Sequence, residues 1–198
     1  MDFALVEPYA VVAALVSALL LLLTQNWRMF LFAMALQYLA AFFLVGLVWA
    51  PGLAAVKVVV GWMAVAVIGA VKPAQGINFQ YHSSKMGVLF RFIAVVIAGL
   101  TVFTITPLTS EWMGIQQRTL FPGLMLVTSG LLQLGLTGQL VRRFVGVLSV
   151  LVGFEIIFAS LSSSVLLAGL MGMIHLGIGL ALSYWITVDN EMRGETPV

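Results

Sequence analysis

The chain has 198 residues, of which 62% are hydrophobic and 8% charged, with a formal net charge of +2 and a mean hydropathy of +1.14. This composition lies far outside that of soluble domains, and it excludes a strongly basic nucleic-acid-binding surface. Because the chain has no cysteine, it cannot hold thiolate-bound iron–sulfur clusters or cysteine-ligated zinc. No cofactor or metal is therefore expected in this chain, and any redox chemistry must belong to partners.

Seven apolar stretches follow one another along the chain, each close to the length of about 20 residues that a membrane-spanning helix needs. They cover about 9–25, 27–49, 51–71, 88–106, 120–140, 143–161 and 165–187. Runs such as Leu19 to Leu23 are apolar on every face, which predicts helices rather than β-barrel strands. The predicted fold is an all-α integral membrane protein with about seven transmembrane helices in a single transmembrane domain, 1–198.

The basic residues fall mostly on one side of these predicted spans. If the loop 72–87 is cytoplasmic, the basic residues inside are Arg28, Lys72, Lys85, Arg91, Arg142, Arg143 and Arg193. Only Arg118 is then outside, with Lys57 in the membrane. The positive-inside rule therefore predicts a multi-pass protein of the inner (cytoplasmic) membrane, with its N-terminus outside and its C-terminus in the cytoplasm. The acidic start of the chain is untypical of a cleavable signal peptide, so the first span is expected to be retained.

Four polar side chains deep inside the predicted spans stand out, because a charge at that depth is costly and marks a functional site by default. Glu155 is about twelve residues into the sixth span, or about 18 Å at 1.5 Å per residue, which is near mid-membrane. His175 and Gln37 are similarly deep, whereas Lys57 is close enough to a span end for its stem to snorkel outward. These four residues are the predicted proton relay. No nucleophile and base pair or phosphate loop is evident, so the chain is not expected to be catalytic by itself.

Each of these residues also has a purely structural interpretation. A protonated Glu155 or a neutral His175 can simply hydrogen-bond a neighbouring helix. A polar row made of Ser129, Gln133 and Thr137 repeats every four residues along one face of the fifth span, and His175, Gly179 and Ser183 repeat that spacing on the seventh. Such rows serve either as the lining of a water wire beside Glu155 or as interhelical contacts, and the sequence leaves both open. Three glycines of the seventh span are expected to allow close helix packing: Gly172, Gly177 and Gly179.

The deep polar residues recur in order along the chain. Gln37 precedes Lys57 by 20 residues (57 − 37), and Glu155 precedes His175 by the same number (175 − 155). Each pair also follows a basic turn on the same side of the membrane. This recurrence predicts two parallel three-helix units joined by an extra helix. The units cover about 9–71 and 120–187, with 88–106 as the connector.

Short segments of the second unit carry a resemblance to known families. They are Gly130-Leu-Leu, Gln139-Leu-Val-Arg-Arg-Phe, Val150-Leu-Val-Gly-Phe-Glu and Ile174-His-Leu-Gly-Ile-Gly-Leu-Ala-Leu. They resemble the three-helix K subunit of bacterial complex I and its relative in Mrp antiporters. The whole chain is more similar still to the hydrogenase-4 component E family, loosely over about 20–70 and better over 125–187. The resemblance matches Glu155 to a membrane acid and Arg142 and Arg143 to a cytoplasmic basic turn, and it puts His175 in place of a second acid.

The resemblance implies a membrane-arm subunit of a complex I-like or membrane-bound hydrogenase-like oxidoreductase complex that contributes to proton or other ion translocation. The implied partners are antiporter-like integral membrane subunits and a peripheral electron-transfer arm, in addition to the lipid bilayer. No nucleic-acid partner is expected. Two alternatives remain open, a structural membrane anchor of such a complex and a small stand-alone transporter. The electron donor and acceptor, and the choice between H⁺ and Na⁺, also remain open.

Overall fold

The computed structural model describes residues 3–24, 26–71 and 85–192, which contain seven helices and no strand. The helices are α1 (Phe3–Leu23), α2 (Trp27–Gly46), α3 (Pro51–Ala70), α4 (Lys85–Met113), α5 (Gln117–Leu136), α6 (Leu140–Ala159) and α7 (Val165–Met192). The predicted all-α fold is confirmed. Within the described ranges, six helices are long and apolar enough to cross a membrane. The exception is α6, which matches α2, α3 and α5 in length but carries Arg142, Arg143 and Glu155. The chain therefore has the helices of a multi-pass membrane protein.

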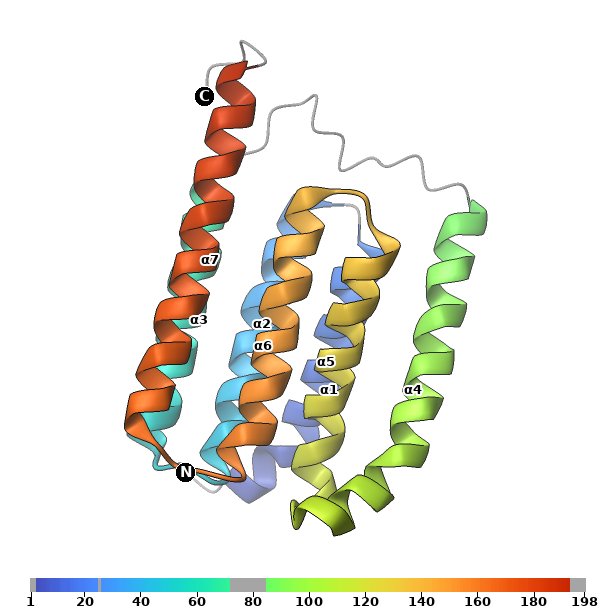
Figure 1. Cartoon of the computed structure of the whole chain (residues 1–198), viewed down its shortest axis with the longest axis vertical. Helices are drawn as coiled ribbons and strands as arrows, with labels where there is room; N and C mark the ends of the chain where they lie inside the picture. Colours follow the sequence, from blue (N-terminus) through green and yellow to red (C-terminus); the bar gives the residue numbers. More distant parts are fainter. Residues whose placement is uncertain (1–2, 25, 72–84, 193–198) are drawn as a thin grey trace.

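Two helix boundaries differ from the prediction in ways that bear on the site. Helix α4 extends beyond the expected 88–106 and continues past Pro107, and its ribbon changes direction toward its C-terminal end (Figure 1). A proline removes one hydrogen bond and bends a helix without necessarily ending it. Helix α6 begins at Leu140, so Arg142 and Arg143 lie in its first turn. The hydropathy pattern instead predicts them in the linker before this helix. Hydropathy places such a boundary poorly because charged side chains can fold back onto main-chain carbonyls.

Successive helices run in opposite directions, so their linkers alternate between two ends of the bundle (Figure 1). The lower end, as drawn in Figure 1, holds the linkers 47–50, 114–116 and 160–164 and the start of α1. The upper end holds the end of α1, the start of α2, the linker 137–139 and the end of α7. The described basic residues Arg28, Arg91, Arg142 and Arg143 all belong to the upper half, whereas Arg118 is at the lower end. Lys72, His82 and Arg193 lie outside the described residues.

The three helices before α4 pack against the three helices after it. Helices α1, α2 and α3 contact α5, α6 and α7, respectively, and α2 and α6 each contact both neighbours in their own set. Helix α4 packs mainly on α5 and also contacts α1. Much of its apolar surface is exposed, including Phe90, Leu100 and Phe103. These contacts agree with the expected division into two three-helix units and a connector, which stays a prediction.

Small residues allow the closest of these helix contacts. A Cβ atom added to Gly130 of α5 would lie 2.6 Å from the carbonyl oxygen of Gly146 on α6. One added to Gly153 of α6 would lie 2.5 Å from the carbonyl oxygen of Gly123 on α5. The main chains of α5 and α6 therefore touch at two levels, as small residues permit in membrane bundles. This α5–α6 contact was not predicted from the sequence.

The glycines that were predicted to pack lie on α7. A Cβ on Gly172 would meet Val60 of α3 at 3.4 Å, and one on Gly179 would meet Ala64 of α3 at 3.2 Å. Nothing lies within 4 Å of such an atom on Gly177. The packing role is therefore correct for the first two glycines and wrong for Gly177, which faces away from α3.

Candidate functional site

A buried ion pair joins α3 to α6. Lys57 of α3 and Glu155 of α6 are only 5% and 7% exposed, and Lys57 Nζ donates a hydrogen bond to Glu155 Oε1. The two residues are 98 positions apart in the chain. The sequence allowed Lys57 to extend toward the bundle end. Its ammonium bonds to Glu155 instead, because that carboxylate lies within its reach. Two of the four predicted relay residues are thus in direct contact.

The pair lies in the lower half of the bundle. Glu155 is four residues before the end of α6 (159 − 155), which is about 6 Å along the axis. Lys57 is six residues after the start of α3 (57 − 51), which is about 9 Å. Because α3 starts and α6 ends at the lower end, the two side chains meet at nearly the same level. Glu155 is therefore nearer a helix end than the expected mid-span position, since α6 both starts and ends earlier than predicted.

His175 of α7 is the third member of this cluster and is 2% exposed. Its Nδ1 atom lies 2.8 Å from the carbonyl oxygen of Met171 and 3.8 Å from Glu155 Oε1. A carbonyl oxygen only accepts, so Nδ1 carries the hydrogen of this bond. In the neutral ring Nε2 then has a free lone pair, and it has no hydrogen-bond partner among the described residues. His175 thus places Nδ1 beside the Lys57–Glu155 pair and keeps Nε2 as its basic nitrogen.

Tyr38 of α2 also belongs to the cluster, although it is absent from the residues predicted from sequence. Its ring meets the His175 ring edge-on, with centroids 5.6 Å apart and an interplanar angle of 73°. Its hydroxyl is buried and has no hydrogen-bond partner within the described part of the chain. The ring fits because Gly61 of α3 has no side chain: a Cβ there would be 2.2 Å from the Tyr38 ring. The sequence contained one signal that could have identified Tyr38. It lies in the middle of a predicted span, whereas tyrosines of membrane helices favour the interfaces.

Gln37 does not join this cluster. Its Oε1 atom accepts a hydrogen bond of 3.2 Å from Ser149 Oγ on α6, and its Nε2 atom has no partner among the described residues. The side chain is 3% exposed and thus links α2 to α6 in the bundle interior. Of the four predicted relay residues, Lys57, Glu155 and His175 come together, whereas Gln37 bonds elsewhere.

The predicted water-wire residues are all buried, and their side chains bond mainly to their own helices. The hydroxyls of Ser129, Thr137 and Ser183 donate to main-chain carbonyls three or four residues earlier. Gln133 instead reaches another helix, because its Nε2 donates at 3.3 Å to the carbonyl oxygen of Leu21 in α1. Gln133 therefore acts as an interhelical contact. The hydroxyl oxygens keep lone pairs that can accept from water, and the water wire stays a prediction.

A second buried cation, Arg142, lies at the upper end of the bundle. It is 2% exposed and donates through Nη1 to the carbonyl of Leu21 at 3.3 Å and through Nη2 to the carbonyl of Thr24. Its guanidinium carbon also lies 5.7 Å from the ring centroid of Phe30. The neighbouring Arg143 donates through Nε to the carbonyl of Thr137 at 3.0 Å. The predicted basic turn thus satisfies carbonyls at the ends of α1 and α5, as cations near helix C-termini can.

A polar cavity opens at the lower end, not far along the chain from Glu155. Its volume is about 380 Å³, and its lining includes Gln116, Thr119 and Ser160. The Ser160 hydroxyl is buried and has no partner in the described residues. Ser160 follows Glu155 by five positions (160 − 155). Trp49, which follows the lining residue Val48 in the chain, donates its indole N–H to the carbonyls of Ala159 and Ser162 at 3.0 and 3.1 Å.

The chemistry available to the cluster is the transfer and storage of protons. The residues that the structure describes contain no group of three His, Asp or Glu that could hold a metal ion. In comparisons with known proteins, no family model matches the chain, and no curated protein or solved structure matches it significantly. The resemblance to the hydrogenase-4 component E family therefore stays a prediction.

Proposed function

We propose that this chain is a membrane-arm subunit of a complex I-like or membrane-bound hydrogenase-like complex, in which Glu155 exchanges a proton during ion translocation. The observation that carries this proposal is the buried Lys57–Glu155 ion pair, with His175 beside it, in a bundle most of whose described helices are apolar enough to cross a membrane. Ionisable residues in such helices are costly and are functional by default. A buried pair is also a poor stabiliser compared with apolar residues of similar size, so stability alone does not account for it.

Protonation of Glu155 would change the forces between α3 and α6. The ionised carboxylate attracts the Lys57 ammonium strongly because both groups are removed from water. A proton on the carboxyl removes its charge and leaves only a hydrogen bond. The pair can therefore couple the arrival of a proton to the packing of the two helices. This coupling requires no redox group in the chain itself.

His175 provides the adjacent proton carrier. Its Nε2 lone pair can accept a proton, after which the Nδ1–H faces both Met171 O and Glu155 Oε1. The proton on Nδ1 can then pass to the carboxylate once the 3.8 Å gap shortens to hydrogen-bond length. The polar cavity beside Ser160 supports access for water from the lower end. The Tyr38 ring packs edge-on against the imidazole ring.

The proposed orientation places the upper end in the cytoplasm and the lower end outside the inner membrane. It is supported by the concentration of described arginines in the upper half. The natural absence of cysteine makes single-cysteine labelling clean. In intact cells, Glu111→Cys at the lower end should react with an impermeant maleimide, whereas Gly138→Cys at the upper end should react only after lysis. Labelling of Gly138→Cys in intact cells would reverse the orientation.

Lateral association with other membrane subunits is part of the proposal. Large exposed apolar residues cover much of α4, as the surface of a subunit in contact with lipid or neighbouring helices requires. Purification in a mild detergent should therefore retain hydrophobic partner subunits. A homogeneous monomer with full transport activity after reconstitution would favour the stand-alone transporter instead.

The decisive experiment measures proton uptake by inverted vesicles, normalised to the assembled complex. A single Glu155→Gln change leaves the Lys57 charge without its counter-ion, so the paired variant Lys57→Met/Glu155→Gln is the cleaner test. It removes titration and charge together and should assemble, yet uptake should be lost. Glu155→Asp should keep part of the uptake, and Glu111→Gln, at an exposed acid, should leave it unchanged. If the paired variant pumps at the wild-type rate, the chain is a structural anchor and Glu155 has no role in transport.

A further inference from the structure

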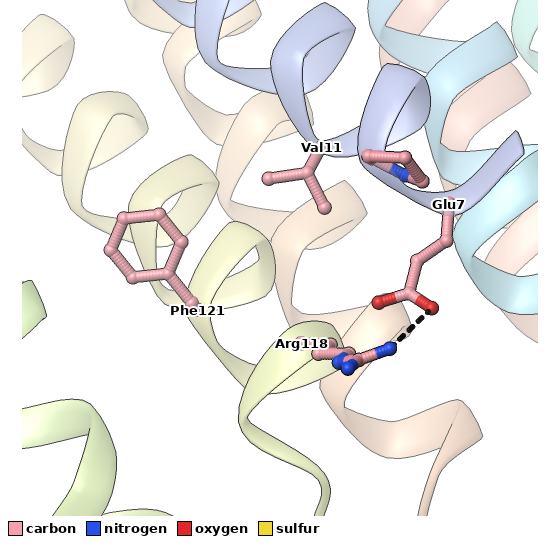
Figure 2. A pocket seen from close by; sticks show the side chains of 5 residues that line it. Glu7, Val11, Arg118 and Phe121 are labelled. Atoms are coloured by element: carbon pink, nitrogen blue, oxygen red, sulfur yellow. Dashed lines mark ion pairs between the residues drawn. The ribbon is translucent and has the colours of Figure 1, made fainter.

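A second cavity lies at the lower end between α1 and α5, away from the Lys57–Glu155 pair. Its volume is about 490 Å³, and its lining consists of Glu7, Pro8, Val11, Arg118 and Phe121. Figure 2 shows Glu7 and Arg118 turned toward one another at one edge of the cavity, with Val11 and Phe121 along its wall. Its size is within the range of small-molecule sites. The cavity thus has one charged edge and one apolar side.

The charged edge is only loosely closed. Arg118 Nη1 and Glu7 Oε2 are 3.6 Å apart, which is longer than a hydrogen bond between these atoms. The Arg118 side chain is 76% exposed, whereas that of Glu7 is 14% exposed. The guanidinium and the carboxylate therefore keep most of their hydrogen-bonding capacity. A cation and an anion a short distance apart complement a ligand that carries both charges.

The apolar side continues onto α4. The ring of Phe121 meets that of Phe103 on α4 edge-on, with centroids 6.4 Å apart. Tyr9 of α1 and Trp112 of α4 are 74% and 84% exposed near the same end of the bundle. Exposed Tyr and Trp side chains are typical of the membrane–water interface. These exposed aromatic side chains favour a membrane–water interface at this end, which would place the charged edge of the cavity at headgroup level.

We infer that this cavity binds the headgroup of a zwitterionic phospholipid with a primary ammonium, of the phosphatidylethanolamine type. The phosphate accepts hydrogen bonds from Arg118, for which the guanidinium fork is well suited. The ammonium donates to Glu7. The start of an acyl chain lies against Val11 and Phe121. An anionic lipid is disfavoured because its headgroup has no cation to offer to Glu7.

Native mass spectrometry of the purified full-length chain tests this inference. Delipidated protein is incubated separately with phosphatidylethanolamine and phosphatidylglycerol at equal concentration, with inorganic phosphate as a competitor in a third arm. The wild-type chain should retain one phosphatidylethanolamine in preference to phosphatidylglycerol. Glu7→Gln and Arg118→Gln should each weaken phosphatidylethanolamine binding about tenfold, the effect of losing one charge-assisted hydrogen bond. Phosphatidylglycerol should bind Glu7→Gln better than the wild type, because a repulsive carboxylate is removed.

Two further variants guard against indirect effects. Arg28→Gln removes an exposed arginine at the upper end and should leave lipid retention unchanged. Val11→Trp fills the cavity without changing charge and should reduce binding of both lipids, provided that thermal unfolding shows the fold intact. Equal retention of phosphatidylethanolamine by Glu7→Gln and the wild type would overturn the inference. So would preference for phosphatidylglycerol, displacement by inorganic phosphate, or retention unchanged in a folded Val11→Trp variant.

Discussion

Two of the buried cations, Lys57 near the lower end of the bundle and Arg142 near the upper end, are satisfied in different ways. Lys57 bonds to the carboxylate of Glu155, a side chain that can itself take up a proton. Arg142 donates to the main-chain carbonyls of Leu21 and Thr24, which do not titrate, and it lies over the ring of Phe30. Both side chains are almost inaccessible to solvent.

This difference separates a centre that can switch from one that cannot. In the proposed function, a proton on Glu155 would cancel the charge that holds Lys57, so the α3–α6 contact would depend on protonation. Arginine stays charged in proteins, and peptide carbonyls remain acceptors at all physiological pH values. The contact of Arg142 with the end of α1 therefore needs no titrating partner. The predictions below test whether the two centres really divide in this way.

The largest expected effect on stability comes from Lys57→Met. It leaves Glu155 buried without its counter-ion, and loss of one partner of a buried pair typically costs about 3–5 kcal/mol of unfolding free energy. The paired variant Lys57→Met/Glu155→Gln should recover most of that loss. Reversible unfolding in mixed micelles, analysed as a double-mutant cycle, measures the coupling. Equal stability of the single and paired variants would show that the two residues are not coupled.

Arg142→Met should have the next largest effect on stability but should leave transport unchanged. It removes hydrogen bonds from a charged donor to the end of α1, with an expected loss of about 3 kcal/mol. Arg142→Lys should recover only part of this, because an ammonium lacks the planar fork that reaches two carbonyls. Unfolding free energy and proton uptake per assembled complex are both measured. A fall in uptake per complex comparable with that of the Glu155 variants would contradict the distinction between the centres.

Gly61→Ala should disturb the lower centre alone. The added Cβ would overlap the Tyr38 ring, which must then move away from His175, at a cost of about 1–3 kcal/mol for overpacking. Proton uptake should fall while the upper centre is unaffected. Gly52→Ala is the matched control, because nothing lies within 4 Å of a Cβ there. If the two alanine variants behave alike, Tyr38 does not position the histidine.

The smallest effect is expected for Ser149→Ala, which removes the hydrogen bond to Gln37. One neutral hydrogen bond contributes about 1 kcal/mol, so stability should fall by no more than this, and uptake should be unchanged. Ser17→Ala is the control, since that buried hydroxyl bonds to the carbonyl of Ala14 on its own helix. A large loss of uptake in Ser149→Ala alone would bring Gln37 into the proton path, as the sequence predicted.

The sequence was informative where a polar residue interrupts an apolar span. Glu155, His175 and Lys57 were all singled out on that ground, and the structure brings these three together. Tyr38 was missed because an aromatic ring does not break the apolar pattern. The first turn of α6 was also missed, since Arg142 and Arg143 resemble a polar linker until their carbonyl partners are known.

Composition and hydropathy by themselves determined the number and type of helices. Away from water, a helix satisfies the polar groups of its backbone by hydrogen bonds within the same segment. They also determined which side chains needed partners, since a charge in lipid is costly wherever it lies. Only the tertiary structure decided which residues are the partners of these charged side chains. Lys57 and Glu155 are 98 residues apart, and their contact depends on which faces of α3 and α6 turn toward each other. That choice is made by packing between helices, including the glycine contacts of α5 with α6, and no local pattern in the sequence encodes it.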